Sequence, residues 1–274
     1  MRYFLIAGEA SGDLHASNLM KGLLEADPSA EFCYMGGDLM REVGGDMVMH
    51  YRETSYMMLD VLFHLRKIFR NMRLLKRKIS EWKPDVLIPV DYPGFNLRMA
   101  RYAAGQGIRV FYYISPKVWA WKQRRVHALK RYVNRMFAIL PFEVEFFRRF
   151  DMEVEYFGNP LVDQVSAFRE HCEGKEAWCR KHGLGQKTLV ALLAGSRLTE
   201  HETTLPAMLS LAGEHPDHQF VVAGAPSIDP SVYRRYLSDS DVQLVYNETY
   251  ALLASARAGI INSGTATLEA ALFE

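Results

Sequence analysis

The chain has 274 residues, of which 49% are hydrophobic and 24% charged, with a formal net charge of +1. This is the composition of an ordinary α/β protein, and the length predicts two domains of usual size. Three cysteines are too few for a disulfide framework, and no segment approaches 18 successive apolar residues, so these features exclude a disulfide-rich exported domain and a membrane-spanning helix.

Strand-like and helix-like segments alternate through the first half of the chain, which is typical of a doubly wound parallel sheet. The predicted strands are Tyr3–Ala7, Glu31–Met35, Val86–Val90, Val110–Ile114, Met136–Leu140 and Glu153–Phe157. The predicted helices are Leu14–Ala26, Met58–Trp82, Leu97–Ala104, Lys122–Val133 and Glu143–Phe150.

The pattern changes after the turn signal Gly158-Asn159-Pro160, where we place a domain junction. The polar stretch Phe168–Lys187 carries no strand pattern, and a second βα series follows it. Its predicted strands are Leu189–Ala194, Gln219–Ala223, Val242–Tyr246 and Gly259–Ile261. We therefore expect domains at 1–160 and 161–274, the second incomplete because its last helix has no C-terminal cap.

Three strand-to-helix junctions contain glycine and small polar residues. They are the stretch from Ile6 to His15, Gly195-Ser196-Arg197, and the stretch from Asn262 to Glu269. Backbone N–H groups at the start of a helix attract anions, so each junction is a candidate phosphate-binding loop. Each is equally compatible with an ordinary βα turn.

The near-zero net charge conceals two basic segments without acidic residues. The first lies between Asp60 and Glu81, and the second ends before Glu143. Together they hold 14 of the 33 lysines and arginines: Arg66, Lys67, Arg70, Arg73, Lys76, Arg77, Lys78, Lys117, Lys122, Arg124, Arg125, Lys130, Arg131 and Arg135. Such clusters attract phosphates or anionic lipid headgroups.

Several short motifs occur in a fixed order along the whole chain. They are Ala7-Gly-Glu-Ala-Ser-Gly-Asp13, Asp91-Tyr-Pro-Gly-Phe-Asn96, Tyr113-Ile-Ser-Pro-Lys-Val-Trp-Ala-Trp121 with Arg124-Arg125, Leu140-Pro-Phe-Glu143, Gly195-Ser-Arg197 and Ser263-Gly-Thr-Ala-Thr-Leu-Glu269. With these motifs the sequence resembles the lipid-A-disaccharide synthases, inverting glycosyltransferases of family 19. The resemblance implies a GT-B fold, with two Rossmann-like domains of parallel sheet facing a cleft, the first binding the acceptor and the second the UDP-sugar donor.

The resemblance also implies the reaction. A 2,3-diacylglucosamine unit passes from its UDP derivative to 2,3-diacylglucosamine 1-phosphate, giving the β-1,6 lipid A disaccharide 1-phosphate and UDP. Inversion at the sugar carbon requires a base for the acceptor hydroxyl and charge stabilisation for the departing diphosphate. Two alternatives stay open: another GT-B transferase or epimerase acting on UDP-N-acetylglucosamine, and a non-catalytic lipid-binding fragment.

The resemblance implies two catalytic residues. Asp91 follows the apolar strand Val86–Val90 and is the candidate base, although an aspartate before Pro93 also suits a helix cap. Arg197 follows a strand within a glycine loop and is the candidate diphosphate ligand. Its alternative is a surface pair with Glu200 or Glu202.

The remaining candidate residues are those that the resemblance implies for binding the UDP-sugar donor and the acceptor sugar. Those for the UDP-sugar are Gly195, Ser196, Asn262, Ser263, Gly264, Thr265, Thr267 and Glu269, the glutamate accepting from the ribose hydroxyls. Those for the acceptor are Gly8, Glu9, Ser11, Gly12, Asp13, Asn96, Ser115 and Trp119. Ser11 and Asp13 also suit the N-cap of a helix beginning near Leu14, and Asn96 also suits a cap or an orienting role for Asp91.

The basic segment before Trp82 predicts an amphipathic helix, with apolar residues at three- and four-residue spacing. This pattern fits a helix that packs on the core. Because the implied substrates are acylated and lie in a bilayer, it also fits a helix that binds an anionic membrane surface. Tyr56–Leu59 and Val61–Phe63 could then cover acyl chains. The expected location is the cytoplasmic face of the inner membrane, and a homodimer is possible for the full-length protein.

No cofactor and no metal site are expected. Cys179 and His182 stand three residues apart, but His171 is too distant along a helix to complete a zinc site with them. Trp119 and Trp121 beside basic residues resemble a stacking platform for single-stranded nucleic acid, yet no RNA-binding signature accompanies them. We therefore expect no nucleic-acid partner.

Overall fold

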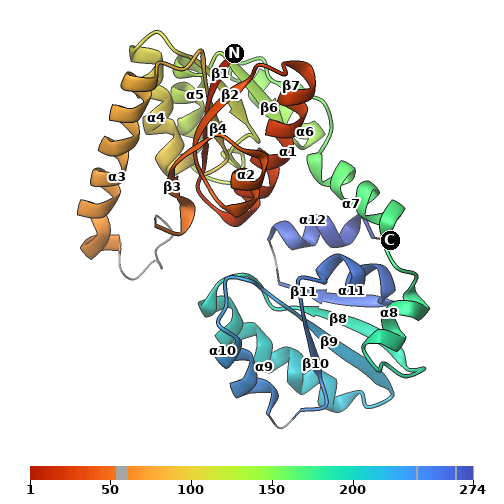
Figure 1. The fold of residues 1–274 in the computed structure, drawn as a ribbon. Coiled ribbons are helices and arrows are strands. Elements are labelled where there is room, and N and C mark those ends of the chain that lie inside the picture. Colours follow the sequence, from red (N-terminus) through yellow and green to blue (C-terminus); the bar gives the residue numbers. More distant parts are fainter. Residues whose placement is uncertain (54–60, 239, 263, 274) are drawn as a thin grey trace. The chain divides into compact units, whose positions relative to one another are not determined.

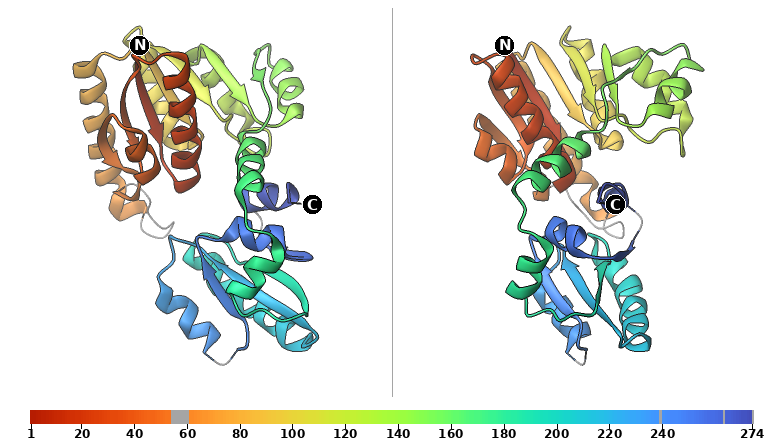
Figure 2. Two further views of the ribbon diagram at one scale, coloured as in Figure 1. Left: turned by 45° about the vertical axis from the view of Figure 1, so that its right-hand side comes forward. Right: turned by 90° about the vertical axis from the view of Figure 1, so that its right-hand side faces the viewer.

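The computed structural model describes residues 1–53, 61–238, 240–262 and 264–273, and for 61–65 and 265 the backbone alone. The chain divides into two compact units, Met1–Pro160 and Leu161–Glu274, and each is considered by itself. Figure 1 shows the elements of both units, and Figure 2 shows them from two further sides. The predicted segments Tyr56–Leu59 and, for side chains, Val61–Phe63 lie outside the described residues.

Unit 1 is a seven-stranded parallel sheet in the order β3-β2-β1-β4-β5-β6-β7. Its strands are β1 (Arg2–Ala7), β2 (Glu31–Gly36), β3 (Asp46–His50), β4 (Val86–Val90), β5 (Arg109–Tyr113), β6 (Arg135–Ala138) and β7 (Glu155–Tyr156). Its helices are α1 (Ala10–Ala26), α2 (Asp38–Val43), α3 (Val61–Trp82), α4 (Pro93–Gly105), α5 (Val126–Tyr132) and α6 (Pro141–Arg148), with short 3-10 turns η1 (Tyr51–Glu53) and η3 (Gln123–Arg125). The strand order reverses direction between β1 and β4, as in Rossmann folds.

Alternate residues of each unit 1 strand face opposite helix layers. Phe4 and Ile6 of β1 pack with α3 and α4, whereas Tyr3 and Leu5 pack with α1 and α2 (Figure 1). A parallel sheet buried on both faces needs continuous apolar strands, and Val86–Val90 is such a strand with every residue buried. The period-2 alternation of side chains thus gives the three-layer sandwich.

Unit 2 repeats this plan on a smaller scale, with the sheet order β10-β9-β8-β11. Its strands are β8 (Thr188–Leu193), β9 (His218–Gly224), β10 (Gln243–Tyr246) and β11 (Ala258–Ile261). Its helices are α8 (Lys175–Lys181), α9 (Leu198–Glu214), α10 (Pro230–Leu237), α11 (Thr249–Ser255) and α12 (Thr265–Ala271), and α7 (Pro160–His171) begins at the junction. One sheet face packs on α8, α11 and α12, the other on α9 and α10.

The structure corrects the prediction near the first glycine loop. Helix α1 begins at Ala10, four residues before the predicted start, so Ser11 and Asp13 lie in its first turn and neither is the N-cap. The structure also contains α2 and the strand β3, which the sequence pattern did not indicate. Strand β3 has one fully buried side chain, Met49, and therefore gives a weak hydrophobic signal.

Candidate functional site

Asp91 lies directly after β4, at the point where the strand order of unit 1 reverses. Ala7 at the end of β1 pairs with Val90 at the end of β4, so the loops that follow these strands leave the sheet side by side. The Tyr92 ring packs so closely on Gly8 that a side-chain carbon there would come within 2.4 Å of it. Such reversal points are where open α/β sheets bind ligands, so this edge is the candidate site of unit 1.

The backbone at Asp91 adopts a left-handed conformation that L residues seldom use. Asp91 and Tyr92 have φ values of 42° and 46°. The carbonyl oxygen of Asp91 accepts hydrogen bonds from the Asn96 side-chain amide at 2.8 Å and from the Tyr112 hydroxyl at 2.6 Å. Asn96 also donates to the Val90 carbonyl at 3.1 Å and is itself fully buried. These contacts hold the strained turn, and they make Asn96 an internal support for Asp91.

The carboxyl group of Asp91 is held in an environment that disfavours its charge. Burial is the main cause, the Glu9 carboxylate adds to it, and the Lys117 ammonium opposes it, so that the pKa of Asp91 rises to about 6. Tyr92, which precedes α4, has no side-chain cap bond, and Asp91 itself is not the residue before the helix. A carboxyl group with a pKa close to neutral suits general base chemistry.

Glu143 organises a buried network beside this loop, and we did not select it from the sequence. Its side chain is 1% exposed. One oxygen accepts from the Ser115 hydroxyl at 2.6 Å and the Trp119 indole at 3.2 Å, and the other accepts from the N–H groups of Ile139 and Leu140. Two sequence signals pointed to Glu143: it ends the motif Leu140-Pro-Phe-Glu143, and it lies three residues after Leu140, where glutamate caps helices. Ser115 and Trp119, both predicted to bind the acceptor, are therefore tied to Glu143.

Asp13 has an internal role that competes with the predicted one. Its side chain is 3% exposed and accepts from the N–H groups of Gly37 at 2.7 Å, Leu39 at 3.1 Å and Met40 at 3.2 Å, at the start of α2. This carboxylate therefore satisfies the first turn of α2. Of the other predicted acceptor residues, Gly8 and Gly12 are buried, Ser11 is half-buried and Glu9 is exposed.

The corresponding reversal point in unit 2 lies between β8 and β11. Ile261 pairs with Leu193, the Asn262 N–H donates to the Leu193 carbonyl at 2.8 Å, and the loop from Gly195 to Arg197 emerges beside Asn262. Gly195 has a φ of 106°, and a side-chain carbon there would lie within 2.4 Å of Glu200 and 2.8 Å of Asn262. Only glycine fits this position.

Glu200 binds the loop that was predicted to bind a diphosphate. One oxygen accepts from the N–H groups of Ser196 and Arg197 at 3.0 and 3.1 Å, and the other pairs with the Arg197 guanidinium at 2.9 Å. The Arg197 side chain is 68% exposed, so most of the guanidinium remains open to solvent. The surface pair considered as the alternative for Arg197 is thus present in the structure.

A buried histidine supports the same loop from inside unit 2. His201 is fully buried, and its ring nitrogens lie 2.6 Å from the Tyr233 hydroxyl and 3.3 Å from the Arg197 carbonyl. The Tyr233 hydroxyl accepts from the Ala225 N–H at 2.8 Å. Burial lowers the pKa of His201, which keeps the ring neutral and able to donate from one nitrogen and accept at the other.

Four other residues predicted to bind the UDP-sugar have internal partners. The Asn262 amide lies 3.4 Å from the Ala194 carbonyl. The Glu269 carboxylate accepts from the Tyr250 hydroxyl at 2.8 Å, so one of its oxygens is already used. At the start of α12, the Thr267 hydroxyl accepts from the Gly264 N–H at 3.3 Å. Ser263 and the side chain of Thr265 lie outside the described residues.

Unit 2 also contains an open pocket of about 440 Å³ beside α8 and α11. Glu248 lies in its wall and accepts from the Trp178 indole, from Lys181 at 3.2 Å and from His182, whose ring nitrogen is 2.8 Å away. His182, weighed above as a zinc ligand with Cys179, is therefore engaged by Glu248, while Cys179 packs against the apolar core.

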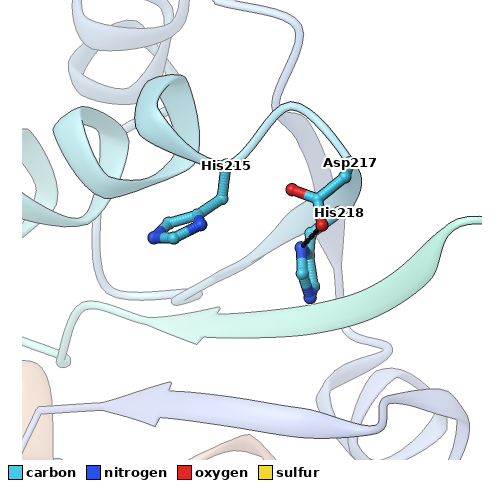
Figure 3. A group of neighbouring side chains, drawn as sticks. All are labelled: His215, Asp217 and His218. Carbon is cyan, nitrogen blue, oxygen red and sulfur yellow. Dashed lines mark ion pairs between the residues drawn. The ribbon is translucent and has the colours of Figure 1, made fainter.

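One group of side chains in the described part of the chain could hold a metal ion. The nearest ligand atoms of His215, Asp217 and His218 lie within 4.8 Å of one another. Figure 3 shows the Asp217 carboxylate directed at the His218 ring, at 3.0 Å, with His215 beside this pair. The group lies at the start of β9, whose first residue is His218, at the edge of the sheet opposite the Gly195 loop. The ion pair itself accounts for the approach of Asp217 and His218.

Helix α3 presents both polar and apolar residues to solvent. Met72, Leu75 and Ile79 are buried in the unit 1 core, as a core-packing helix requires. Phe69 and Leu74, in contrast, are 56% and 46% exposed among basic side chains. Within the described ranges, no helix is both long and apolar enough to cross a bilayer.

Comparison with known sequences relates the chain to one family. The profile described as lipid-A-disaccharide synthetase matches residues 3–274. The lipid-A-disaccharide synthase of Syntrophus aciditrophicus is 38% identical over 98% of the chain and 71% of its own length. The corresponding proteins of Geobacter metallireducens and Myxococcus xanthus are 37% and 38% identical, over 99% and 100% of the chain and 72% of their lengths.

Solved structures with the same fold have little sequence similarity to the chain. The UDP-GlcNAc 2-epimerase of Neisseria meningitidis bound to UDP-GlcNAc gives a TM-score of 0.71 at 13% identity, covering 96% of this chain and 78% of the epimerase. The S. aureus MnaA–UDP structure gives 0.73 at 14% identity, covering 99% and 77%. A calicheamicin glycosyltransferase gives 0.59 at 16% identity, covering 98% and 77%. The predicted GT-B fold is confirmed.

Proposed function

Because the chain belongs to the lipid-A-disaccharide synthetase family, we propose that it transfers 2,3-diacylglucosamine from its UDP derivative to 2,3-diacylglucosamine 1-phosphate. The products are the β-1,6 lipid A disaccharide 1-phosphate and UDP. As a member of this family the chain is a hexosyltransferase of lipid A synthesis.

The environment of Asp91 is the observation that supports the mechanism. A carboxylate that takes a proton from the acceptor 6-hydroxyl needs a pKa high enough to hold that proton, and Asp91 has a pKa of about 6. Its position beside the Gly8 loop, at the carboxyl edge of the sheet, suits an acceptor bound to unit 1. Asn96 and Tyr112 hold the Asp91 carbonyl and so fix the direction of the base.

Arg197 is the proposed ligand of the departing diphosphate. Its exposed guanidinium can form bidentate contacts with phosphate oxygens, and Glu200 holds the loop in place from the other side. Gly195, Ser196, Asn262, Ser263, Gly264, Thr265, Thr267 and Glu269 remain the proposed neighbours of the UDP moiety. Glu269 would have to share its carboxylate between Tyr250 and the ribose hydroxyls.

The acceptor candidates separate into two groups. Glu9 is exposed next to Asp91 and is proposed to face the acceptor together with Gly8, Ser11 and Gly12. Asp13, Asn96 and Ser115 are buried with internal partners, and we propose that they shape the site rather than touch the sugar. Trp119 is half-buried and has one edge bound to Glu143, which leaves its ring as a proposed acceptor contact.

We propose that the enzyme acts at the cytoplasmic face of the inner membrane. Acylated substrates lie in a bilayer, and α3 carries exposed Phe69 and Leu74 among Arg66, Arg70 and Arg73. Apolar side chains flanked by cations favour binding to an anionic lipid surface. A homodimer stays a prediction.

Mass-spectrometric product analysis with both lipid substrates tests the proposal. The parent chain should form tetraacyl disaccharide 1-phosphate, and Asp91→Asn should reduce kcat by about 10² to 10⁴. Asp151→Asn is a matched control, because Asp151 shares a left-handed backbone, with φ 50°, but is exposed. Equal product from the parent and Asp91→Asn would remove the base role. If UDP-N-acetylglucosamine is supplied instead, its epimerisation can be followed by NMR, because epimers have the same mass. Epimerisation there, without disaccharide from the lipid substrates, would favour the epimerase alternative.

A further inference from the structure

The loop between β5 and α5 is the most strongly basic part of unit 1 beside the candidate base. It contains Lys117, Lys122, Arg124 and Arg125, and no acidic residue occurs in the sequence from Pro116 to Phe142. The loop begins at Ile114, after β5, and β5 is the neighbour of β4 in the sheet. The Asp91 N–H donates to the Tyr113 carbonyl at 3.1 Å, so the two loops are joined at their bases.

The loop is anchored on its inner side and open on its outer side. On the inner side, Glu143 accepts hydrogen bonds from Ser115 and Trp119 of the loop, as described above. On the outer side, Trp121 is 60% exposed, and the Lys122 ammonium and the Arg125 guanidinium lie 4.1 and 5.7 Å from its ring. Contacts with the ring restrict both side chains without neutralising their charge.

The four loop cations, Lys117, Lys122, Arg124 and Arg125, form no ion pair with an acidic residue that the structure describes. In the described part of the chain, ion pairs within 4.0 Å involve other residues of the second basic segment, namely Lys130 and Arg135, but none of Lys117, Lys122, Arg124 and Arg125. Uncompensated positive charge at the edge of a buried site is a feature of anion-binding sites.

Two of these cations act on the surroundings of Asp91. Lys117 lowers the pKa of Asp91, in opposition to burial. Arg125 lowers the pKa of Tyr112, whose hydroxyl binds the Asp91 carbonyl, although burial leaves that pKa raised overall. The Lys117 charge is therefore close enough to act on the base, and the Arg125 charge is close enough to act on Tyr112, which holds the backbone of the base.

We propose that Lys117 and Arg125 form the subsite for the phosphomonoester of the acceptor sugar, with the exposed ring of Trp121 holding Arg125 in position. The inference rests on the proposed function, in which the acceptor carries a phosphate on C1, across the ring oxygen from C5, and C5 bears the hydroxymethyl group whose 6-hydroxyl Asp91 deprotonates. A guanidinium binds two phosphate oxygens at once, and an ammonium adds a compact second charge. These residues would then distinguish a phosphorylated acceptor from a neutral one.

The test compares acceptors with and without the 1-phosphate, in detergent micelles free of anionic lipid. Lys117→Ala and Arg125→Ala should each lower kcat/KM for the phosphorylated acceptor by about 10- to 100-fold, as expected for one lost charge-assisted contact. An effect of Lys117→Ala that acts through the pKa of Asp91 would change kcat/KM for both acceptors by the same factor. The quantity that decides is therefore the ratio of kcat/KM for the phosphorylated acceptor to that for the unphosphorylated one, which each variant should lower by about 10- to 100-fold. Arg125→Lys, which keeps the charge but loses the fork, should recover part of the loss.

Arg131→Ala is the matched control, since Arg131 lies in the same basic segment on α5, is exposed and rests on the ring of Tyr132. It should leave the kcat/KM values for both acceptors unchanged. Equal losses on both acceptors from Lys117→Ala and Arg125→Ala would overturn the proposal, because the two residues would then act on the base or the loop and not on a phosphate.

A second measurement separates the acceptor phosphate from a lipid headgroup. Binding of the variants to vesicles of zwitterionic lipid with added phosphatidylglycerol should match that of the parent. If vesicle binding fell while the preference for the phosphorylated acceptor persisted, the cations would serve the membrane and the proposal would be wrong. If the parent made no disaccharide from either acceptor, the proposed function itself would fail, and this subsite with it.

Discussion

The loops after β4 and β8 each follow one of the two strands at the reversal point of their own sheet, yet the charged residues Asp91 and Arg197 on these loops have opposite environments. Asp91 is half-buried, its backbone is strained and its charge is opposed by burial and by Glu9. Arg197 is exposed, extended in its backbone and paired with Glu200. A proton acceptor has to be destabilised as a charged group in order to act, whereas an anion-binding arginine has only to be positioned.

Replacement of Arg197 is predicted to have a large effect on activity and a small one on stability. Arg197→Ala should lower kcat by about 10² to 10³, because a positioned charge on the departing diphosphate is lost. The stability of unit 2 should change by less than about 1 kcal/mol, since an exposed ion pair contributes little. Steady-state kinetics and thermal unfolding measure the two quantities.

Arg235→Ala serves as the control for Arg197, since Arg235 is an exposed arginine of the same unit that rests on Tyr236. It should leave both quantities unchanged. A loss of stability without a loss of kcat in Arg197→Ala would show that the arginine is only structural.

Replacement of Asp91 should lower activity but raise stability, whereas replacement of Arg197 should leave stability almost unchanged. Because folding raises its pKa from 3.8 to about 6, the folded state binds its proton more tightly than the unfolded state. The stabilisation from this group is complete below pH 3.8 and is lost as the pH rises through 6. Ionisation at pH 7 then costs up to about 3 kcal/mol, so Asp91→Asn should stabilise unit 1 by up to that amount at pH 7 and very little at pH 3.8.

Unfolding free energies of the parent, Asp91→Asn and Asp151→Asn at several pH values measure this effect. The difference between variants is the quantity to read, because burial also lowers the pKa of His15 in the same unit to about 4 and gives the parent a pH dependence of opposite sign. An Asp91→Asn variant less stable than the parent at pH 7 would contradict a strained, charge-disfavouring site.

Asp13 tests whether a carboxylate of the first glycine loop is structural. Asp13→Ala should destabilise unit 1 by about 2 to 3 kcal/mol, because three N–H groups at the start of α2 lose a charged acceptor. Hydrogen exchange of the β1 and β2 amides reports this loss. Glu25→Ala, at an exposed position of α1, the helix that also contains Asp13, should have little effect on stability. Weaker acceptor binding at unchanged stability would instead return Asp13 to the acceptor site.

Tyr233 tests the support of the Arg197 loop and carries the smallest predicted effect. Tyr233→Phe removes the hydroxyl that accepts from the Ala225 N–H and lies 2.6 Å from His201, at a cost of about 1 to 2 kcal/mol to unit 2. Tyr236→Phe, on the same helix and partly exposed, is the control. The measurement is the free energy of unfolding of unit 2 in each variant. Equal stability of the two variants would exclude a structural role for the buried pair of Tyr233 and His201.

Local patterns predicted the sheets and helices well where the apolar signal was strong. Val86–Val90 and Leu189–Ala194 form buried strands within a residue of the predicted bounds, since a continuous apolar run fits a sheet covered on both faces. The start of α1 was misplaced because Ser11 and Gly12 are poor helix formers, and the hydrogen bond between Asp13 and Gly37, next to α2, supports that first turn.

The motifs of the sequence determined the family, the reaction and the order of the two glycine loops, because these depend on residue types that follow one another along the chain. Only the tertiary structure decided what each polar side chain binds. It placed Glu143 within hydrogen-bond distance of Ser115 and Trp119, and the Asp13 carboxylate at the N–H groups of α2. It also brought Lys117 near Asp91 and Arg125 near Tyr112. The physical reason is that hydrogen bonding and charge depend on neighbours in space, and these neighbours lie up to several strands apart in the sequence.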